Sequence, residues 1–250
     1  NKNYWVKISW LRSKPSQELF DKCVQLIASS NAKSRMIGID ILAQLGLSPR
    51  PFFKETRKIL FQTLEDEKDT KVISSLLFAI GHNNHKMSQK QIKTLCSFSD
   101  KPHQDIREAL TFALLGLEDS QAIQTLIKLS EDKLSRIRNW ATFGLGESTD
   151  LDNEDIQNAL QKRLKDRHME TRYEAILGLA KRKYHDISEI IESELLKNNY
   201  STLLYEAVMV TQNRYFLPLL EKQLHDVQED NDIPSECIEK LKECINFLYY

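Results

Sequence analysis

Four side chains of the kinds that bind transition metals occur in one part of the chain. The stretch GHNNH contributes His82 and His85, and Cys96 and His103 follow it. Structural zinc sites pair such ligands at short, regular spacings, and the spacing here is irregular. We interpret the histidines as polar residues of a loop and Cys96 as a buried thiol of a helix. The sequence therefore predicts no metal and no cofactor.

The acidic stretch DLDNED at 150–155 is a second candidate for ion chemistry. Calcium loops of the EF-hand type need a central glycine and a final glutamate, and both are missing here. Acidic residues also favour the first turn of a helix, where the backbone dipole is positive. The chain has no nucleophile-elbow serine motif and no phosphate-binding glycine loop. These patterns predict a protein that is not an enzyme.

A basic stretch over residues 162–183 carries the strongest local charge. Eight basic residues stand against three acidic ones, a balance of +5. The net charge of −1 and the pI of about 6.7 give no global reason to expect nucleic acid. Solvated turns are the favoured interpretation, and nucleic acid stays an alternative partner. The candidate basic ridge consists of Arg163, Lys165, Arg167, Lys181, Arg182 and Lys183.

Composition limits the fold class that can position these residues. The 250 residues are 41% hydrophobic and 28% charged, which is ordinary for a protein with a sizeable core. Glycine and proline are few and hairpin turns such as Asn-Gly are missing, so helices are expected. No apolar run reaches the length of a membrane span. Four scattered cysteines fit reduced thiols. We therefore expect an all-α, cytoplasmic protein that does not enter a membrane.

The helical pattern repeats along the chain. The stretches DKLSRIRNWATFGLG at 132–146 and DRHMETRYEAILGLA at 166–180 share Asp, Arg, Ala, Gly and Leu in one frame. The frame position of the central arginine, named the marker, falls at residues 35, 73, 107, 138, 172 and 204. Each step between markers has room for two helices of roughly a dozen residues with short turns. We name the first helix of each pair the A helix and the second, which carries the marker, the B helix.

The repeats predict a single domain over residues 1–250. Residues 1–15 form an N-terminal cap, 16–213 the repeats and 214–250 the C-terminal capping helices. The cap fits a helical face and also a strand alternation, and we favour a short helix. All seven glycines lie on or just after B helices. Close approach of neighbouring helices, or a left-handed helix end, explains this recurrence.

Arginine occupies the marker in four of the six repeats, near the boundary between units. A guanidinium in such a place must be paired, and Asp132 and Asp166 precede Arg138 and Arg172 by the same offset. We predict that these aspartates bridge to the arginines within or between repeats, a structural role that the regular register favours over anion binding. The predicted seam consists of Arg35, Arg107, Arg138, Arg172, Asp132 and Asp166.

The frame of Asp, marker Arg, Ala and a closing Gly-Leu or Ala-Leu resembles the HEAT-type helical repeat. Its short period resembles the HEAT-like repeat named after phycobilisome lyases. The match covers roughly residues 16–225 and is most specific around Arg107, Arg138 and Arg172. This resemblance implies an α-solenoid of about six hairpins, with A helices on the convex side and B helices on the concave side. Helical-repeat di-iron hydroxylases depend on His-Glu pairs, which this chain lacks.

Residues just after the marker, and one turn later, are expected to face the concave groove, because they lie off the core stripe of the B helix. Aromatic side chains in a groove suit the recognition of a protein or peptide. Packing between repeats is an equally good explanation of the same pattern, and both stay open. The candidate partner-binding residues are Glu108, Asn139, Tyr173, Tyr205, Phe112 and Phe143.

The sequence thus predicts a non-enzymatic scaffold or adaptor that binds a protein or peptide through its concave surface. This prediction is an analogy at the level of the fold, because one solenoid can serve many partners. One alternative is a protein that binds or repairs nucleic acid. Another, implied by the name of the repeat, is a lyase-like or chaperone-like subunit that acts on a pigment-bearing protein.

Overall fold

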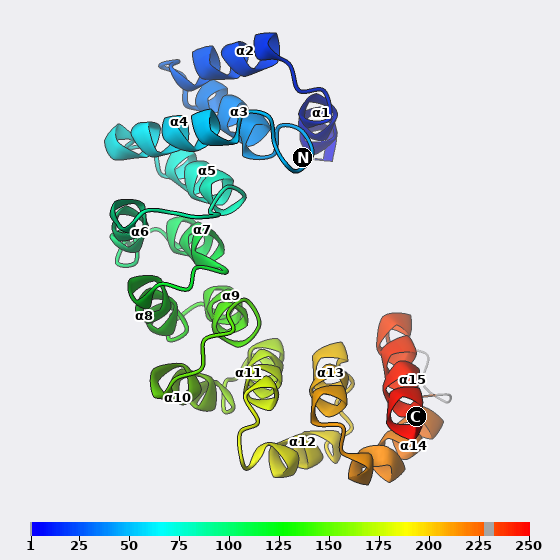
Figure 1. Ribbon diagram of the computed structural model, residues 1–250. Coiled ribbons are helices and arrows are strands. Elements are labelled where there is room, and N and C mark those ends of the chain that lie inside the picture. The colour runs from blue at the N-terminus through cyan, green and yellow to red at the C-terminus, as the bar shows by residue number, and fades with distance from the viewer. Residues whose placement is uncertain (1, 228–232) are drawn as a thin grey trace. The chain divides into compact units, whose positions relative to one another are not determined.

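The computed structural model describes residues 2–227 and 233–250, and all regular elements in these ranges are helices. Helical hairpins stack side by side, so the fold is an α-solenoid, as the sequence predicts (Figure 1). The chain divides into two compact units, Asn1–Leu129 and Ser130–Tyr250, with the boundary in the turn between α8 and α9. The single domain over residues 1–250 stays a prediction.

Unit 1 consists of the N-terminal helix, four A helices and three B helices. The B helices α3, α5 and α7 lie side by side in chain order, and α2, α4 and α6 each pack against the B helix that follows (Figure 1). The bounds are α1 (Lys2–Arg12), α2 (Gln17–Ile27), α3 (Ala32–Ala43), α4 (Phe53–Asp66), α5 (Thr70–Gly81), α6 (Gln89–Cys96), α7 (Gln104–Leu114) and α8 (Ser120–Leu129).

Unit 2 continues the same pattern. The B helices α9, α11 and α13 pack in order, α15 extends their row, and α10 and α12 pack against the B helices that follow. A short 3-10 helix leads into α14, whose first turn contains Pro218. The bounds are α9 (Ser135–Gly146), α10 (Glu154–Arg163), α11 (Met169–Lys181), α12 (Ile187–Leu195), α13 (Thr202–Thr211), η1 (Arg214–Phe216), α14 (Leu217–Asp226) and α15 (Ser235–Tyr249).

Capping residues fix where the A helices begin. Ser16 accepts the backbone N–H of Leu19 at 3.1 Å, and Ser88 forms a capping box with Gln91. The acidic stretch 150–155 opens α10, where Asn153 accepts the N–H of Ile156 at 3.0 Å. Caps of this kind are worth about 1 kcal/mol each. The acidic stretch is thus a helix start, as its charge pattern predicts.

The B helices differ in how much they bury, from four of the ten residues of α13 to most of α11. In α11, nine of its 13 residues are buried, from Thr171 to Ala180 with Arg172 excepted. Gly146 of α9 and Gly178 of α11 allow the two backbones to meet, since a Cβ on Gly178 would lie 2.6 Å from the Cα of Gly146. This contact confirms the close helix approach expected from the glycine pattern.

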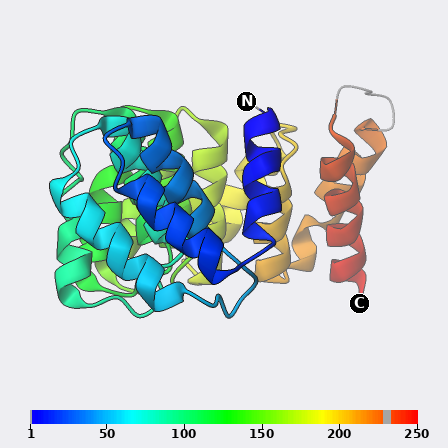
Figure 2. The same ribbon diagram turned by 90° about the horizontal axis from the view of Figure 1, so that it is seen from above.

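The N-terminal cap is a helix, α1, and it packs beside α3 rather than within the stack of unit 1 (Figures 1 and 2). Ile8 is its one buried residue, whereas Trp5 and Trp10 are exposed. Nε and Nη2 of Arg12 donate to the carbonyl oxygen of Asp40 at 2.8 and 2.5 Å. These bonds hold α1 against the B-helix row.

Candidate protein-binding surface

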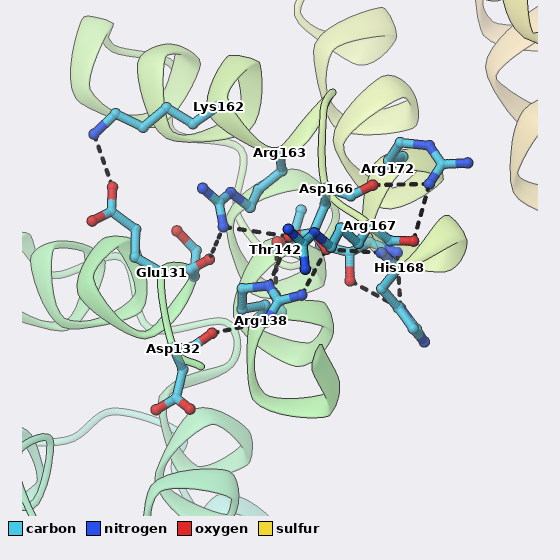
Figure 3. Close-up of polar contacts among 12 residues, drawn as sticks. Glu131, Asp132, Arg138, Thr142, Lys162, Arg163, Asp166, Arg167, His168 and Arg172 are labelled. Atoms are coloured by element: carbon cyan, nitrogen blue, oxygen red, sulfur yellow. Dashed lines mark hydrogen bonds and ion pairs between the residues drawn. The ribbon is translucent and has the colours of Figure 1, made fainter. Parts of the chain in front are cut away.

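The marker arginines close the turns between A and B helices. Nη1 of Arg138 donates to the carbonyl oxygens of Asp132 and Lys133 at 2.9 and 3.2 Å (Figure 3). Carbonyl groups in such turns lack partners in regular structure, and the guanidinium supplies them. Arg35, Arg107 and Arg172 make the same pair of bonds, to the residues six and five positions before them.

Arg138 and Arg35 also reach a carboxylate in the next repeat. Nε and Nη2 of Arg138 each lie 2.7 Å from a carboxylate oxygen of Asp166 (Figure 3). Arg35 contacts the carboxylate of Glu67 in the same way, at 2.7 and 3.0 Å. The Asp166 side chain is only 3% exposed. Burial raises its pKa, but hydrogen bonds from Arg138 and the His168 N–H outweigh burial and leave the pKa below its usual value. The ion pair therefore stays charged inside the seam.

The seam pattern changes at its last arginine. Arg172 bonds the carbonyl oxygens of Asp166 and Arg167, but within the described residues it makes no ion pair. Glu67 and Asp166 lie six residues before the markers at 73 and 172, and the same place before the marker at 204 holds Asn198 instead of a carboxylate. The predicted aspartates Asp132 and Asp166 thus each give a backbone carbonyl to the arginine six residues later. Asp166 also gives its carboxylate to Arg138 of the preceding repeat.

Arg182 does not belong to the predicted basic ridge. Its side chain is 6% exposed and donates to five backbone carbonyls, at 2.8 to 3.2 Å. These acceptors belong to the ends of α9 and α11 and to the turn after α9, so the guanidinium ties two B helices together. The sequence shows only a cluster of cations and does not indicate which of them points inward. The five acceptors are Leu145, Gly146, Thr149, Leu151 and Gly178.

The remaining cations of the ridge differ in exposure. Arg163 is half-buried and donates to the carbonyl of Ser130 at 2.8 Å, and Lys181 pairs with Glu147 at 2.5 Å. Both are therefore engaged within unit 2. The exposed cations that make no ion pair within the described residues are Lys165, Arg167 and Lys183.

The structure corrects two of the candidate partner-binding residues. Tyr173 and Tyr205 are completely buried, and their hydroxyls lie 3.4 Å from Glu194 and 3.0 Å from Gln223. These partners belong to α12 and α14, so both rings point between the helix layers, and packing between repeats is the correct explanation for them. The four other candidates, Glu108, Phe112, Asn139 and Phe143, are half-buried.

A cleft of about 540 Å³ opens on unit 1, between α1 and the B helices. Its walls come from α1, α3, α5, α7 and the residue after α5, with no contribution from an A helix. We call the surface of a unit that its B helices present on the side without A helices the B-helix face. Trp5, Met36 and Phe78 give the cleft an apolar lining, and the predicted Glu108 lies at its edge.

The polar side of this cleft is an internal network. Asp40 is 9% exposed, and its two carboxylate oxygens accept the hydroxyls of Tyr4 and Ser75, each at 2.6 Å. Tyr4 comes from α1, the helix predicted as the N-terminal cap. The only trace of this contact in the sequence is that Tyr4 and Asp40 are polar residues on otherwise apolar helix faces. Such a network orders α1 and shapes the cleft.

The histidines and the cysteine considered for a metal do not form a site among the described residues. His82 lies in the cleft, hydrogen-bonds Gln44 at 3.3 Å and packs edge-on against Phe112. Burial, together with Arg12 and Arg50, lowers the pKa of His82 to about 4, so its ring is neutral at pH 7. Over residues 2–227 and 233–250, no three His, Cys, Asp or Glu side chains gather closely enough to hold a metal ion.

Two further features are the apolar length of the helices and the state of the cysteines. None of the helices in the described ranges is both long and apolar enough to cross a bilayer. Cys23, Cys96 and Cys244 are buried and Cys237 is half-buried, all as free thiols. Burial raises the pKa of the Cys23 thiol to about 12, which makes it unreactive.

Comparison with known sequences finds a partial relative. Protein YibA of Escherichia coli strain K12 is 34% identical over 138 residues, which cover 55% of this chain and 49% of YibA. The same match is found in YibA of E. coli O157:H7. The chain thus spans about half the length of the curated relatives that it matches. It matches no model of a known protein family.

Comparison with solved structures supports the fold. The crystal structure of YibA from E. coli matches with a TM-score of 0.71 at 24% identity, over 97% of this chain and 85% of that chain. An engineered protein matches with a TM-score of 0.51 at 15% identity, over 94% and 97% of the two chains. Together with the repeated hairpins, these likenesses make the chain a helical-repeat protein.

Proposed function

We propose that this protein is a non-enzymatic scaffold or adaptor of the HEAT-like repeat type, which binds a protein or peptide partner through the B-helix faces of its units. The observation that carries this proposal is the cleft of unit 1. Trp5 and Phe78 are large apolar side chains left exposed beside a cavity of about 540 Å³. Apolar surface gathered in a concave place is the usual mark of a recognition site.

The polar parts of the cleft support binding over catalysis. Asp40 has both oxygens satisfied by Tyr4 and Ser75, and the neutral His82 is hydrogen-bonded to Gln44. A general acid or base must be placed to reach a substrate, whereas these groups are used internally. Free, buried cysteines accord with a reducing compartment, and we place the protein in the cytoplasm as part of the same proposal.

A photo-crosslinking comparison tests the proposal. A photoreactive phenylalanine analogue replaces Phe78 on the B-helix face, and in a matched variant it replaces Lys93, which is exposed on the A helix α6. After irradiation in native lysate, we expect the Phe78 variant to form one protein adduct of defined mass that the Lys93 variant lacks. Equal adduct patterns from both positions would contradict the proposal, as would recovery of nucleic acid alone.

A further inference from the structure

One carboxylate on unit 2 is buried without a partner. Glu174 of α11 is 8% exposed, and its Oε2 atom is inaccessible to solvent and makes no hydrogen bond. A buried polar atom left unpaired costs about 1 to 3 kcal/mol, and native proteins rarely leave one without a reason. Glu174, two residues after the marker Arg172, thus has a buried carboxylate oxygen for which the described residues offer no hydrogen-bond donor.

The charged groups around Glu174 show which way it faces. The carboxylates that act on it are Glu147 at the end of α9, Glu170 of α11 and Glu206 of α13, and the cation is Lys181. All of these belong to B helices or to the residue directly after one, and none belongs to α10 or α12. Glu174 therefore lies on the B-helix face of unit 2.

Among the described residues, the nearby lysines are paired with other carboxylates and do not neutralise Glu174. Lys181 is paired with Glu147 at 2.5 Å, while the other carboxylate oxygen of Glu147 is buried without a hydrogen bond. Lys240 of α15 is shared between Glu206 and Glu243, at 3.3 and 3.1 Å. Burial, reinforced by the neighbouring carboxylates, raises the pKa of Glu174 to about 8. The face therefore carries an excess of acidic groups around one that stays protonated at pH 7.

An aromatic side chain stands on the adjacent helix. Trp140 of α9 is 40% exposed and packs edge-on against Phe143. Since α9 packs against α11, and Trp140 and Glu174 each lie two residues after their markers, the two side chains share the same face of neighbouring helices. Carboxylates beside an exposed indole are a setting that attracts ammonium and guanidinium groups.

We propose that the B-helix face of unit 2 binds a lysine or arginine side chain from an extended segment of a partner protein, with Glu174 as its carboxylate and Trp140 as its aromatic neighbour. The occupant follows from charge complementarity, because an acidic face with an unpaired carboxylate favours a cation. When the cation binds, the proton on Glu174 leaves to solvent and the resulting carboxylate pairs with it. This inference rests on the proposed function and adds the chemistry that the partner must offer.

Isothermal titration calorimetry with a hexa-arginine peptide tests the site in the full chain at pH 7. Titrations in two buffers of different ionisation enthalpy report the protons exchanged on binding. We expect saturable binding with release of about one proton per peptide, because a carboxyl group with a pKa near 8 is mostly protonated at pH 7. A hexaglutamine peptide should give no heat. Absence of hexa-arginine binding, or binding without proton release, would overturn the inference.

Substitutions locate the site. Glu174→Gln keeps the shape of the side chain but cannot ionise, so it should weaken binding about tenfold and abolish proton release. Glu189→Gln on α12 makes the same substitution at an exposed A-helix position and should change neither quantity. Trp140→Leu should weaken binding about threefold, while Trp10→Leu in α1 should leave it unchanged. Equal weakening by Glu174→Gln and Glu189→Gln would mean general charge attraction and would overturn the site.

The two sets of experiments distinguish a failure of this inference from a failure of the proposed function. If hexa-arginine does not bind but the crosslink at Phe78 forms, the partner is real and the inference about unit 2 is wrong. If no adduct forms at Phe78 and the proton-linked binding at Glu174 still occurs, the cation site exists and the adaptor proposal for unit 1 fails.

Discussion

Unit 1 and unit 2 each bury a carboxylate on the B-helix face, and the two carboxylates differ in their hydrogen bonds. Asp40 in unit 1 is 9% exposed and accepts two hydroxyls, from Tyr4 and Ser75. Glu174 in unit 2 is 8% exposed and keeps one oxygen buried without a partner. Similar burial therefore gives a satisfied structural group in one unit and an unsatisfied group in the other.

The comparison separates what the repeat determines from what a single side chain determines. Ser75 and Glu174 both lie two residues after their markers, so the repeat gives them the same place on a B helix. A hydroxyl in this place donates to the neighbouring repeat, whereas a carboxylate finds no donor there. The backbone array thus provides equivalent positions, and the side chain at each position decides whether it stabilises the fold or binds a ligand.

The largest expected effect comes from removing the main partner of a second buried carboxylate. Arg138→Ala removes the two bonds of 2.7 Å from Arg138 to Asp166, which stays buried in the seam. Breaking such a buried ion pair costs about 4 kcal/mol, because only the Arg163 guanidinium at 3.4 Å and the His168 N–H at 2.9 Å remain beside the carboxylate. Chemical denaturation of the variant at pH 7 measures this loss as a lower midpoint with an unchanged slope.

Arg172→Ala is the matched control for Arg138→Ala. Arg172 makes the same two carbonyl bonds but no ion pair within the described residues, so its loss should be about 1 kcal/mol. The difference in unfolding free energy between the two variants gives the contribution of the ion pair with Asp166. A denaturation curve of Arg138→Ala that overlays the wild type would show that the seam arginine contributes little to stability.

The second effect concerns Glu174 and its dependence on pH. The folded protein raises the pKa of Glu174 from 4.5 to about 8, so between these values the folded state holds a proton that the unfolded state has released. The wild type therefore loses stability as pH rises through this window. Glu174→Gln has no such loss and should be more stable than the wild type by about 3 kcal/mol at pH 7, with the gain vanishing near pH 4.

Thermal melts of both proteins at pH 4, 5.5, 7 and 8.5 measure this dependence. Glu189→Gln, on an exposed position of α12, should follow the wild type throughout. A constant gap between Glu174→Gln and the wild type over the whole range would assign the gain to packing rather than to ionisation. The same variant is expected to bind hexa-arginine less well, so stability and binding should change in opposite directions.

Most of the fold can be predicted from the sequence because the repeat period recurs in residues that must be small or apolar. The marker positions locate all six B helices, and Gly146 and Gly178 indicate where two of them meet. The seam arginines can be predicted from their register alone. Asp166 can also be predicted as a partner, because it is one of the two aspartates expected to bridge within or between repeats. Glu67 cannot, because it lies about one repeat after Arg35, and only the stacking of helices brings the two close.

The candidate surface is harder to predict because it depends on how each B helix is rotated about its own axis. One helix position is a turn of 100°, so a small difference in how a B helix rotates decides whether a side chain faces the groove or the next A helix. Tyr173 and Tyr205 fall on the buried side for this reason. Arg182 looks like its exposed neighbour Lys183 in sequence, yet it reaches five carbonyls. Tyr4 and Asp40 stand out in the sequence as polar residues on apolar helix faces, but nothing in the sequence indicates that the two meet.

The smallest expected effect tests the satisfied carboxylate of unit 1. Tyr4→Phe removes one of the two hydroxyls that Asp40 accepts and should cost about 1 kcal/mol, the usual value for one hydrogen bond. Tyr215→Phe removes an exposed hydroxyl bonded to Glu192 at 2.9 Å and should cost almost nothing, because water replaces the bond. Denaturation midpoints compare the two. Equal losses would mean that Asp40 gains no more from its buried donors than a surface carboxylate does, and the contrast with Glu174 would then arise from its acidic neighbours alone.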